Sequence, residues 1–540
     1  MPDLFFHGGP IYTLDRQQPR VEALLVRDDR IVAAGSATEL RPLLSARFED
    51  VPLDGRAIVP GLTDAHIHLL WTGLGRISVD LDGVDSLDAA LEKVRAHAER
   101  LPEEAWVRGH GWNHALWEHR WPTAADLDRV TGGRPALLSR KDGHSVWLNS
   151  RTLALAGIDR DTPDPSGGSI ARTEAGEPTG ILLENANDLA YRVVPEYTWE
   201  ERRRALLRII GECNQRGLTS VHIPEGPDTL ALLRELRDHD QLTIRALCHL
   251  RYAQLDDAIG LGLRSGMGDE WVRIGGVKIF ADGSLGSCTC HMLDPFAGST
   301  TNYGIATVAE EELHNAVRQA DRAGIAVAIH AIGDRANRTV LDAIAGCARH
   351  PSRAASGSSA AGLRPPRLPH RIEHAQHLDQ ADIRRFAELS VVASMQPVHA
   401  TSDIDIAERL LGPERCAWSY AWRPLLDTGA ILAFGSDAPV ETLDPWAGLH
   451  AALTRRRTNG EPPNGWHPEL TLTMEEALEA YVVGPALASG EAGFKGVLKA
   501  GNLADLVVLA VDPFTVEAQS LWQMPVDMTV VGGKVLEFSG

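Results

Sequence analysis

Lysine, paired cysteine and long apolar runs are scarce in this 540-residue sequence. Lysine provides six of the 53 Lys and Arg residues, so arginine is the usual cation. The six cysteines are scattered and form no CxxC pair, which favours reduced thiols and a cytoplasmic location over a disulfide scaffold. No apolar run reaches the roughly 20 residues of a membrane-spanning helix. The first residues lack a basic region followed by an apolar one, so we expect no secretory signal.

Positive charge is also in deficit. The net charge of −20 argues against nucleic acid or an anionic membrane as a partner. Hydrophobic residues make up 44% and charged residues 23% of the sequence, which is typical of a globular protein. We therefore expect a small-molecule substrate, and the oligomeric state is left open, with a homodimer as one alternative. The residue in excess is histidine, with 21 copies, several of them at the ends of apolar runs.

Strand patterns occupy both ends of the chain, and residues 1–57 and 491–540 predict one small composite β-sandwich domain. Residues 58–490 alternate apolar strand candidates with helical patterns. Eight strands with helical crossovers predict a distorted (β/α)8 TIM barrel of the α/β class, although a doubly wound sheet would show the same alternation. The strand candidates are residues 57–68, 218–225, 242–250, 273–282, 324–334, 370–376, 391–399 and 430–439.

A gap of about 150 residues separates the first two strand candidates. It is rich in Trp, His and Gly, as in "RGHGWNHALWEHRWP". A loop of this length needs structure of its own. We therefore predict a large insert after the first barrel strand, a subdomain of about residues 75–205.

Polar residues follow the apolar part of most strand candidates. In a parallel barrel the carboxyl ends of the strands meet at one mouth, where active sites are found. Imidazole and carboxylate groups gathered there would suit zinc or a similar metal ion. The residues at these positions are His66, His68, His222, Lys278, His330, His374 and Asp437.

The first of these residues form an HxH pair. Residues two apart on a strand face the same side, so His66 and His68 can bind one ion together, although two ordinary hydrogen-bonded histidines would give the same pattern. His330 and His374 end successive strands and are ligand candidates on that ground, with a purely structural role as the alternative. Glu373 and Gln376 flank His374 and are candidates for orienting it.

Asp437 follows the last apolar strand candidate, directly after Gly435 and Ser436. An aspartate at this position is commonly a turn residue. Beside a metal-bound water it would instead act first as a base and then as an acid, because a metal lowers the pKa of its water to near neutral. The sequence leaves both roles open.

Six motifs occur in order along the chain: "GLTDAHIHL", "GGVKIFADGSLGS", "AIHAIGD", "RIEHAQ", "SMQPVHATSD" and "FGSDAPVE". Together they resemble the YtcJ-like (type 3) branch of the amidohydrolase superfamily. The resemblance covers essentially the whole chain. It implies that His66 and His68 hold the more buried of two metal ions, and that His330 and His374 hold the second. It also implies that Asp437 acts on a hydroxide that bridges the two ions.

Lys278 lies within an apolar run, where an ammonium group is costly to desolvate. The resemblance implies that its side chain is carboxylated and that the carbamate bridges both metal ions. Carbon dioxide adds to a neutral amine, which burial favours, and arginine has no comparable neutral state. The alternative is an unmodified lysine that extends to the barrel mouth and pairs with Asp282.

Substrate-binding residues are harder to assign. The stretch "KDGHSVWLNS" matches the family and suggests His144 as a substrate contact, with Trp112, His222 and His399 as further pocket residues. Trp112 and Trp147 could equally form the core of the insert. After "DGSLGS" the chain has "CTCH", where family members often have an arginine, so recognition of the leaving group is not carried over.

The resemblance implies a metal-dependent hydrolase with two divalent ions, zinc being the expected metal. A metal-bridging hydroxide would attack an amide- or formamide-type C–N bond, with N-substituted formamides and other N-acyl amines as the family's substrates. A deaminase, a lactonase or a cyclic-amide hydrolase could use the same site. A non-catalytic binding or regulatory homologue is the alternative from another class of protein.

Overall fold

The structure is a computed structural model that describes residues 2–118, 120–141, 143, 145–165, 168–348 and 367–536. It contains two compact units. The first consists of Met1–Leu69 together with Ile210–Gly540, and the second of Leu70–Ile209. Among the described residues, no helix has the length and apolar character needed to cross a membrane.

The first unit contains a sheet of eight parallel strands. Backbone hydrogen bonds from Ala65 N–H to the Phe434 carbonyl (2.9 Å) and from Asp437 N–H to the His66 carbonyl (2.7 Å) join its first and last strands. The sheet is therefore a nearly closed barrel, which confirms the predicted barrel and excludes an open doubly wound sheet. In order, the strands are β6 (Leu62–Asp64), β13 (Leu218–Ile223), β14 (Arg245–Arg251), β15 (Val272–Phe280), β16 (Ala326–Ala331), β17 (Arg371–His374), β18 (Val392–Met395) and β19 (Ile431–Phe434).

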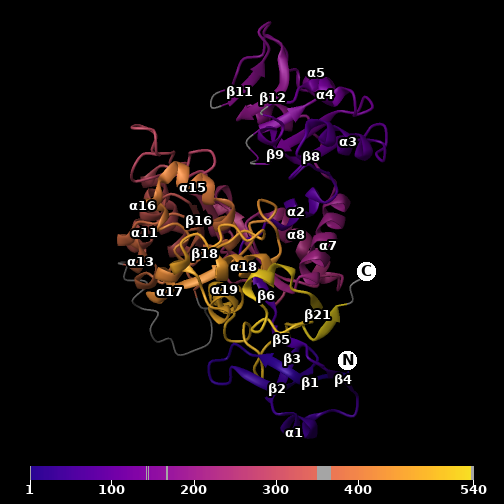
Figure 1. Cartoon of the computed structure of the whole chain (residues 1–540), viewed down its shortest axis with the longest axis vertical. Helices are drawn as coiled ribbons and strands as arrows, with labels where there is room; N and C mark the ends of the chain where they lie inside the picture. The colour runs from indigo at the N-terminus through magenta and orange to yellow at the C-terminus, as the bar shows by residue number, and fades with distance from the viewer. Residues whose placement is uncertain are drawn as a thin grey trace. The chain divides into compact units, whose positions relative to one another are not determined.

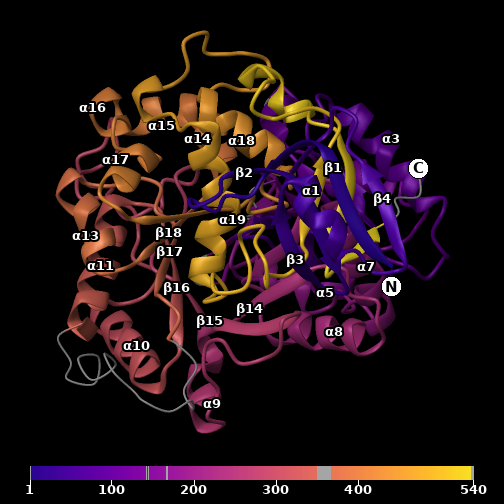
Figure 2. The same cartoon turned by 90° about the horizontal axis from the view of Figure 1, so that it is seen from below.

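Helices cover the outside of the barrel, and Figure 2 shows α10, α11, α13 and α17 around strands β16 to β18. Helix α10 is amphipathic, because its buried residues Leu313, Val317 and Ala320 recur at helical spacing, and it ends at Gly324 in a left-handed conformation. The helices of this unit are α1 (Ala37–Leu40), α8 (Pro227–Asp238), α9 (Leu255–Gly260), α10 (Glu310–Ala323), α11 (Asp334–Ala348), α13 (Ile383–Glu388), α14 (Pro397–Ser402), α15 (Ile404–Leu411), α16 (Pro413–Cys416), α17 (Trp422–Asp427), α18 (Pro445–Thr454) and α19 (Met474–Ala488).

A second sheet of the same unit combines both ends of the chain, so that indigo and yellow strands lie together in Figure 1. Strand β5 pairs with β20 and joins the two halves. The sheet belongs to the same compact unit as the barrel. The predicted β-sandwich and its limits stay predictions. The strands are β1 (Asp3–Tyr12), β2 (Arg20–Arg27), β3 (Arg30–Gly35), β4 (Phe48–Pro52), β5 (Ala57–Pro60), β20 (Leu506–Leu509), β21 (Val526–Val531) and β22 (Lys534–Leu536).

The first strand candidate, residues 57–68, is divided between the two sheets. Its first part is β5 of the terminal sheet and its second part is β6 of the barrel. Gly61 lies at the division, where a Cβ atom would come within 2.3 Å of the Thr219 hydroxyl oxygen. Only glycine permits this close approach, so the division has a local physical cause.

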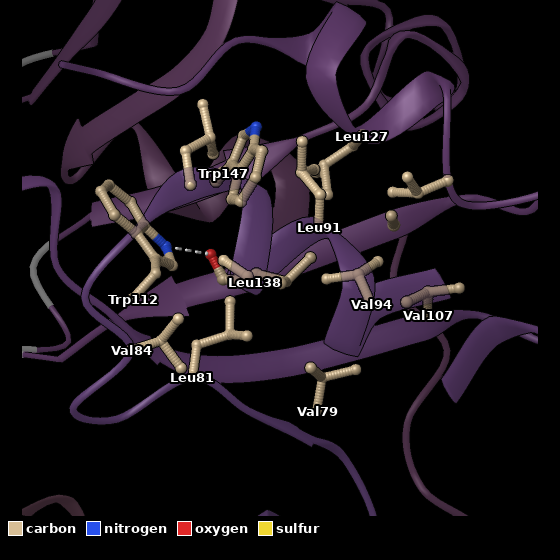
Figure 3. Close-up of a cluster of buried hydrophobic side chains, with 14 of the residues drawn as sticks. Val79, Leu81, Val84, Leu91, Val94, Val107, Trp112, Leu127, Leu138 and Trp147 are labelled. Carbon is tan, nitrogen blue, oxygen red and sulfur yellow. Dashed lines mark hydrogen bonds between the residues drawn. The ribbon is translucent and has the colours of Figure 1, made fainter. Parts of the chain in front are cut away.

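The second unit has its own six-stranded sheet and its own core. Trp112 and Trp147 are fully buried in this core, and Figure 3 shows the Trp112 indole N–H directed at the Leu138 carbonyl (2.8 Å). This burial favours the alternative that Trp112 is a core residue of the insert, and its contact with substrate stays a prediction. The strands are β7 (Val79–Asp80), β8 (Val107–Trp112), β9 (Ala136–Arg140), β10 (Ser145–Leu148), β11 (Gly168–Arg172) and β12 (Pro178–Glu184). The helices within or bounding the unit are α2 (Leu69–Gly75), α3 (Leu87–Ala98), α4 (Ala124–Asp128), α5 (Ser150–Ala156), α6 (Asn187–Tyr191) and α7 (Trp199–Gln215).

Candidate metal centre

Asp437 lies among three histidines at the carboxyl end of the barrel strands. One carboxylate oxygen, Oδ1, is 3.4 Å from Nε2 of His66 and 3.4 Å from Nε2 of His68. The other, Oδ2, is 3.8 Å from Nε2 of His399. Asp437 is therefore in contact with both ends of the predicted HxH pair and with a residue of α14, the helix that follows β18.

Two sets of side chains bring their ligand atoms within 4.8 Å of one another. The first set is the predicted pair, His66 and His68, with Asp437. The second set is His374 and His399, again with Asp437. His399 was predicted as a substrate contact, and the structure places it in a set that could hold an ion.

His330 belongs to neither set but lies beside the second one. The ring centroids of His330 and His374 are 4.6 Å apart. Nε2 of His330 is 3.0 Å from the Gly283 carbonyl oxygen, so this nitrogen is the donor and the ring is held in one orientation. Nδ1 is then the nitrogen of His330 that is available as a ligand.

A buried ion pair supports His66 from the side opposite to Asp437. Nδ1 of His66 is 2.6 Å from Glu373 Oε2, so this nitrogen carries the proton and Nε2 keeps its lone pair. Arg371 donates from Nη2 to Glu373 Oε2 at 3.1 Å, and its Nε lies 2.5 Å from Oε1 as an ion-pair contact. Burial alone would raise the pKa of Glu373, but the charge of Arg371 and the hydrogen bond from His66 hold it well below its ordinary value. Of the two predicted orienting residues, Glu373 is thus an anion that contacts His66 rather than its neighbour His374, and Gln376 donates to Asp403.

His374 is oriented by a neutral group. Its Nδ1 is 2.9 Å from the Gln396 side-chain oxygen. His374 and Ala375 have φ of +74° and +43°, and Asp437 has φ of +58°. These left-handed conformations are costly for residues with a Cβ atom and are concentrated at functional sites. The sequence carries no signal for them.

Lys278 is buried on β15, with 4% of its surface exposed. Burial lowers the pKa of its ammonium group to about 8, against the opposing effect of the Glu373 and Asp437 charges. Its Nζ is 4.9 Å from the centroid of the Phe280 ring, and it forms no ion pair with any carboxylate of the described residues. Asp282 instead accepts backbone hydrogen bonds, among them those of Ile332 and Gly333 at 3.0 and 2.8 Å. The alternative of a Lys278–Asp282 pair is therefore wrong.

Two further histidines lie inside the barrel. His222 is 1% exposed, and its Nδ1 accepts a hydrogen bond from Arg371 (2.9 Å). The His222 ring is therefore almost completely buried, and this burial does not favour the predicted contact with substrate. His249 on β14 was not predicted, and neither of its ring nitrogens has a hydrogen-bond partner among the described residues. The position of His249 within the apolar run "RALCHL" is the sequence feature that could have identified it. His144 lies outside the described residues.

The donor atoms fit a divalent metal ion. Nε2 of His66 and Nε2 of His399 are buried and have no hydrogen-bond partner among the described residues. Buried polar atoms are seldom left unpaired unless an ion, a ligand or water completes them. Imidazole nitrogens with one carboxylate are the ligands that zinc and similar ions prefer.

The comparison with protein families decides the assignment. The model of the "Amidohydrolase family" matches residues 51–536. The chain belongs to the amidohydrolase family. The resemblance inferred from the motifs is therefore confirmed, and membership of this family implies a divalent metal ion as cofactor.

Relatives of this amidohydrolase match it along its full length. It is 34% identical to Protein LONG AFTER FAR-RED 3 of Arabidopsis thaliana, over 99% of this chain and 91% of the relative. It is 32% identical to the putative amidohydrolase YtcJ of Bacillus subtilis, over 98% of each chain. N-substituted formamide deformylase of Arthrobacter pascens is 28% identical, over 99% of this chain and 98% of the relative.

A solved structure shares the fold. An uncharacterized metal-dependent hydrolase from Pyrococcus furiosus superimposes with a TM-score of 0.78 and 28% sequence identity. The match covers 95% of this amidohydrolase and 100% of that chain. The family and this neighbour together support a hydrolase.

Proposed function

We propose that this amidohydrolase cleaves an amide-type C–N bond, with N-substituted formamides and other N-acyl amines as its substrate class. The observation that carries the proposal is the position of Asp437, one carboxylate within 3.8 Å of three imidazole nitrogens at the barrel mouth. The full-length similarity to a relative named N-substituted formamide deformylase supports the choice of bond.

Two divalent ions, zinc in our proposal, would be held by the histidines around Asp437. His66 and His68 would bind one ion, and His330 and His374 the other, with His399 as a further ligand candidate of the second. Lys278 would bridge the ions as a carbamate, for which its burial and its lack of an ion pair within the described residues are the support. When bound, the ions would supply a hydroxide nucleophile at near-neutral pH and polarise the substrate carbonyl.

The chain's own residues would handle orientation and protons. Glu373 fixes the proton of His66 on Nδ1, which leaves Nε2 as the ligand atom. Asp437 would accept the proton of the attacking water and return it to the leaving nitrogen as the C–N bond breaks. The products are then formate, or another carboxylic acid, and a free amine in equal amounts.

The test is product analysis on the zinc-reconstituted enzyme. Incubation with N-substituted formamides should release formate and amine in equal amounts, and Asp437→Asn should lower kcat roughly 10²–10⁴-fold. Release of ammonia without formate would indicate a deaminase. Hydrolysis confined to esters would indicate a lactonase. A protein that takes up no metal and hydrolyses nothing would be a binding homologue, which would overturn the proposal.

A further inference from the structure

Asp403 is a carboxylate near the candidate metal centre that the proposed mechanism does not use. It lies between α14 and α15, four residues after His399, which places the two residues on successive turns of one helical face. The Asp403 N–H donates to the His399 carbonyl at 2.9 Å. His399 in turn faces Asp437, so Asp403 lies one helical turn from the centre.

Two neutral donors hold the Asp403 side chain. Gln376 Nε2 donates to Oδ2 at 2.7 Å, and the Tyr420 hydroxyl donates to the same oxygen at 2.5 Å. Gln376 and Tyr420 are buried, with 3% and 1% exposure. Both donors use one oxygen, and the other oxygen, Oδ1, has no hydrogen bond to any described residue. The carboxylate is therefore fixed in place with one oxygen left for a ligand.

The negative charge of Asp403 has no cation beside it within the described part of the chain. The nearby arginine, Arg457, donates instead to Asp405 at 2.8 Å and to the Thr401 carbonyl at 3.2 Å. Burial raises the pKa of Asp403, against the effect of His399 and of the two neutral donors. Asp403 is half-buried, and even partial desolvation of an unpaired charge is costly.

Neither helix capping nor orientation of His399 accounts for this carboxylate. Asp403 is the N-cap residue of α15, but its side chain makes no capping hydrogen bond. No hydrogen bond joins its carboxylate to the His399 ring, so it does not orient that imidazole. Within the described residues the carboxylate joins Gln376 and Tyr420 through Oδ2, and Oδ1 remains for a further partner.

We propose that Asp403 is a specificity-determining residue that binds a positively charged group on the amine portion of the substrate. The inference rests on the proposed function, since it presumes an N-acyl amine as substrate. A primary ammonium group offers three N–H donors, one of which would reach Oδ1. Charge-assisted hydrogen bonds of this kind are about twice as strong as neutral ones. The substrate class is thereby narrowed to N-acyl diamines, which carry one acylated and one free, protonated nitrogen.

Kinetics on matched substrates test the inference. The substrates are N-formyl linear diamines and N-formyl alkylamines of the same carbon number. We expect wild-type enzyme to favour the diamine derivative by about tenfold or more in kcat/KM, chiefly through KM. Asp403→Asn should abolish the preference and leave kcat/KM for the uncharged substrate and the metal content unchanged. The matched control is Asp405→Asn, which removes one charge from the neighbouring turn, and it should keep the preference.

A binding measurement separates this inference from the proposed function. Calorimetric titration of the metal-loaded protein with the free diamine and with the matched alkylamine requires no hydrolysis. Tighter binding of the diamine that Asp403→Asn removes would uphold the role of Asp403 even if no formamide is cleaved. Cleavage of formamides without any preference for the charged substrate or product would overturn the inference and leave the function standing. Loss of metal in Asp403→Asn would also overturn it, because the residue would then support the centre.

Discussion

At the scale of single residues, the ligand histidines differ in the hydrogen-bond partner of their second ring nitrogen, and this difference affects metal affinity. His66 is backed by the anion Glu373, whereas His374 and His330 are backed by a neutral amide and a backbone carbonyl. An anionic partner raises the basicity of an imidazole ligand more than a neutral one does. The ion at His66 should therefore be the more tightly held of the two.

Glu373→Gln tests this difference. The variant keeps the shape of the side chain but removes the negative charge that faces His66 Nδ1, so we expect metal affinity to fall roughly 10–100-fold. Chelator competition followed by elemental analysis measures it. The matched control is Glu491→Gln, which alters an equally buried carboxylate paired with Lys495 at 3.2 Å. Equal metal affinities of both variants and wild type would contradict the assignment.

Lys278 gives a second prediction at this scale. Lys278→Ala and Lys278→Arg should both lose most bound metal, because neither side chain can become the bridging carbamate. Short carboxylic acids should partly restore metal binding to Lys278→Ala by filling the vacated position. Intact-protein mass under conditions that preserve a carbamate, on the wild type, should show the added carbon dioxide. An unmodified lysine in fully metallated, active enzyme would leave Lys278 with a different role.

The sequence predicts a site residue correctly where the strand pattern alone fixes its position. It does not do so where the position depends on contacts made by the folded chain. His66, His68 and Asp437 end strands of known order, so their meeting followed from the topology. The place of Asp403 and the contact of Glu373 with His66 could not be predicted from the topology. These contacts depend on side-chain directions and on the left-handed backbone at His374. Burial of Trp112 could not be distinguished from exposure in a pocket, since both need an aromatic residue.

At the scale of elements, the seam between β6 and β19 is what places His66 against Asp437. Gly435 lies at this seam, and a Cβ atom there would come within 2.4 Å of the His66 backbone nitrogen and 2.7 Å of Asp64 Oδ1. Asp64 also accepts hydrogen bonds from the backbone N–H groups of His66 (3.1 Å) and Ser436 (3.0 Å). One glycine therefore permits both barrel closure and the geometry of the site.

Gly435→Ala should consequently lose metal binding and destabilise the fold by about 1–3 kcal/mol, the usual cost of forcing atoms into a filled space. Thermal unfolding and metal analysis of the purified variant measure the two effects. Gly346→Ala is the control, since a Cβ at this exposed position of α11 meets nothing within 4 Å. That change should keep metal and raise stability by roughly 1 kcal/mol, because alanine favours a helix. Retention of metal in Gly435→Ala would contradict the prediction, because it would show that His66 and Asp64 can move away from the added Cβ atom without loss of the site.

Barrel strands and their order were predictable because each is an apolar run with its own flanking turn signals. The division of residues 57–68 was not, because the run continues through Gly61 without a change in hydrophobicity. What separates β5 from β6 is the contact of Gly61 with Thr219, a residue more than 150 positions away. Only the folded chain reveals such a contact.

At the scale of the whole molecule, a buried ion pair fastens the terminal sheet to the barrel. Arg245 on β14 donates to Asp505 from Nε at 2.6 Å and from Nη2 at 3.0 Å. Burial alone would raise the pKa of Asp505, but the Arg245 charge holds it below its ordinary value. Removing one partner of such a pair leaves an uncompensated buried charge.

Arg245→Met should therefore lower the free energy of unfolding by about 3–5 kcal/mol. The double variant Arg245→Met/Asp505→Asn should be more stable than this single variant, because it removes the isolated charge and keeps an acceptor for the Gly532 N–H. Denaturant unfolding of the single variants and the double variant completes the cycle. Additive losses in the double variant would mean that the two side chains do not act as a pair.

The pairing of β5 with β20 also sets an order of events during synthesis. The ribosome delivers β5 early, but β20 emerges only after every strand of the barrel has been made. At ordinary elongation rates this interval is on the order of a minute. Throughout it β5 is paired only on its β1 side, and the edge that β20 later occupies is open to pairing with other chains. We therefore expect truncation before β20 to yield a polypeptide that chaperones retain and that aggregates when released.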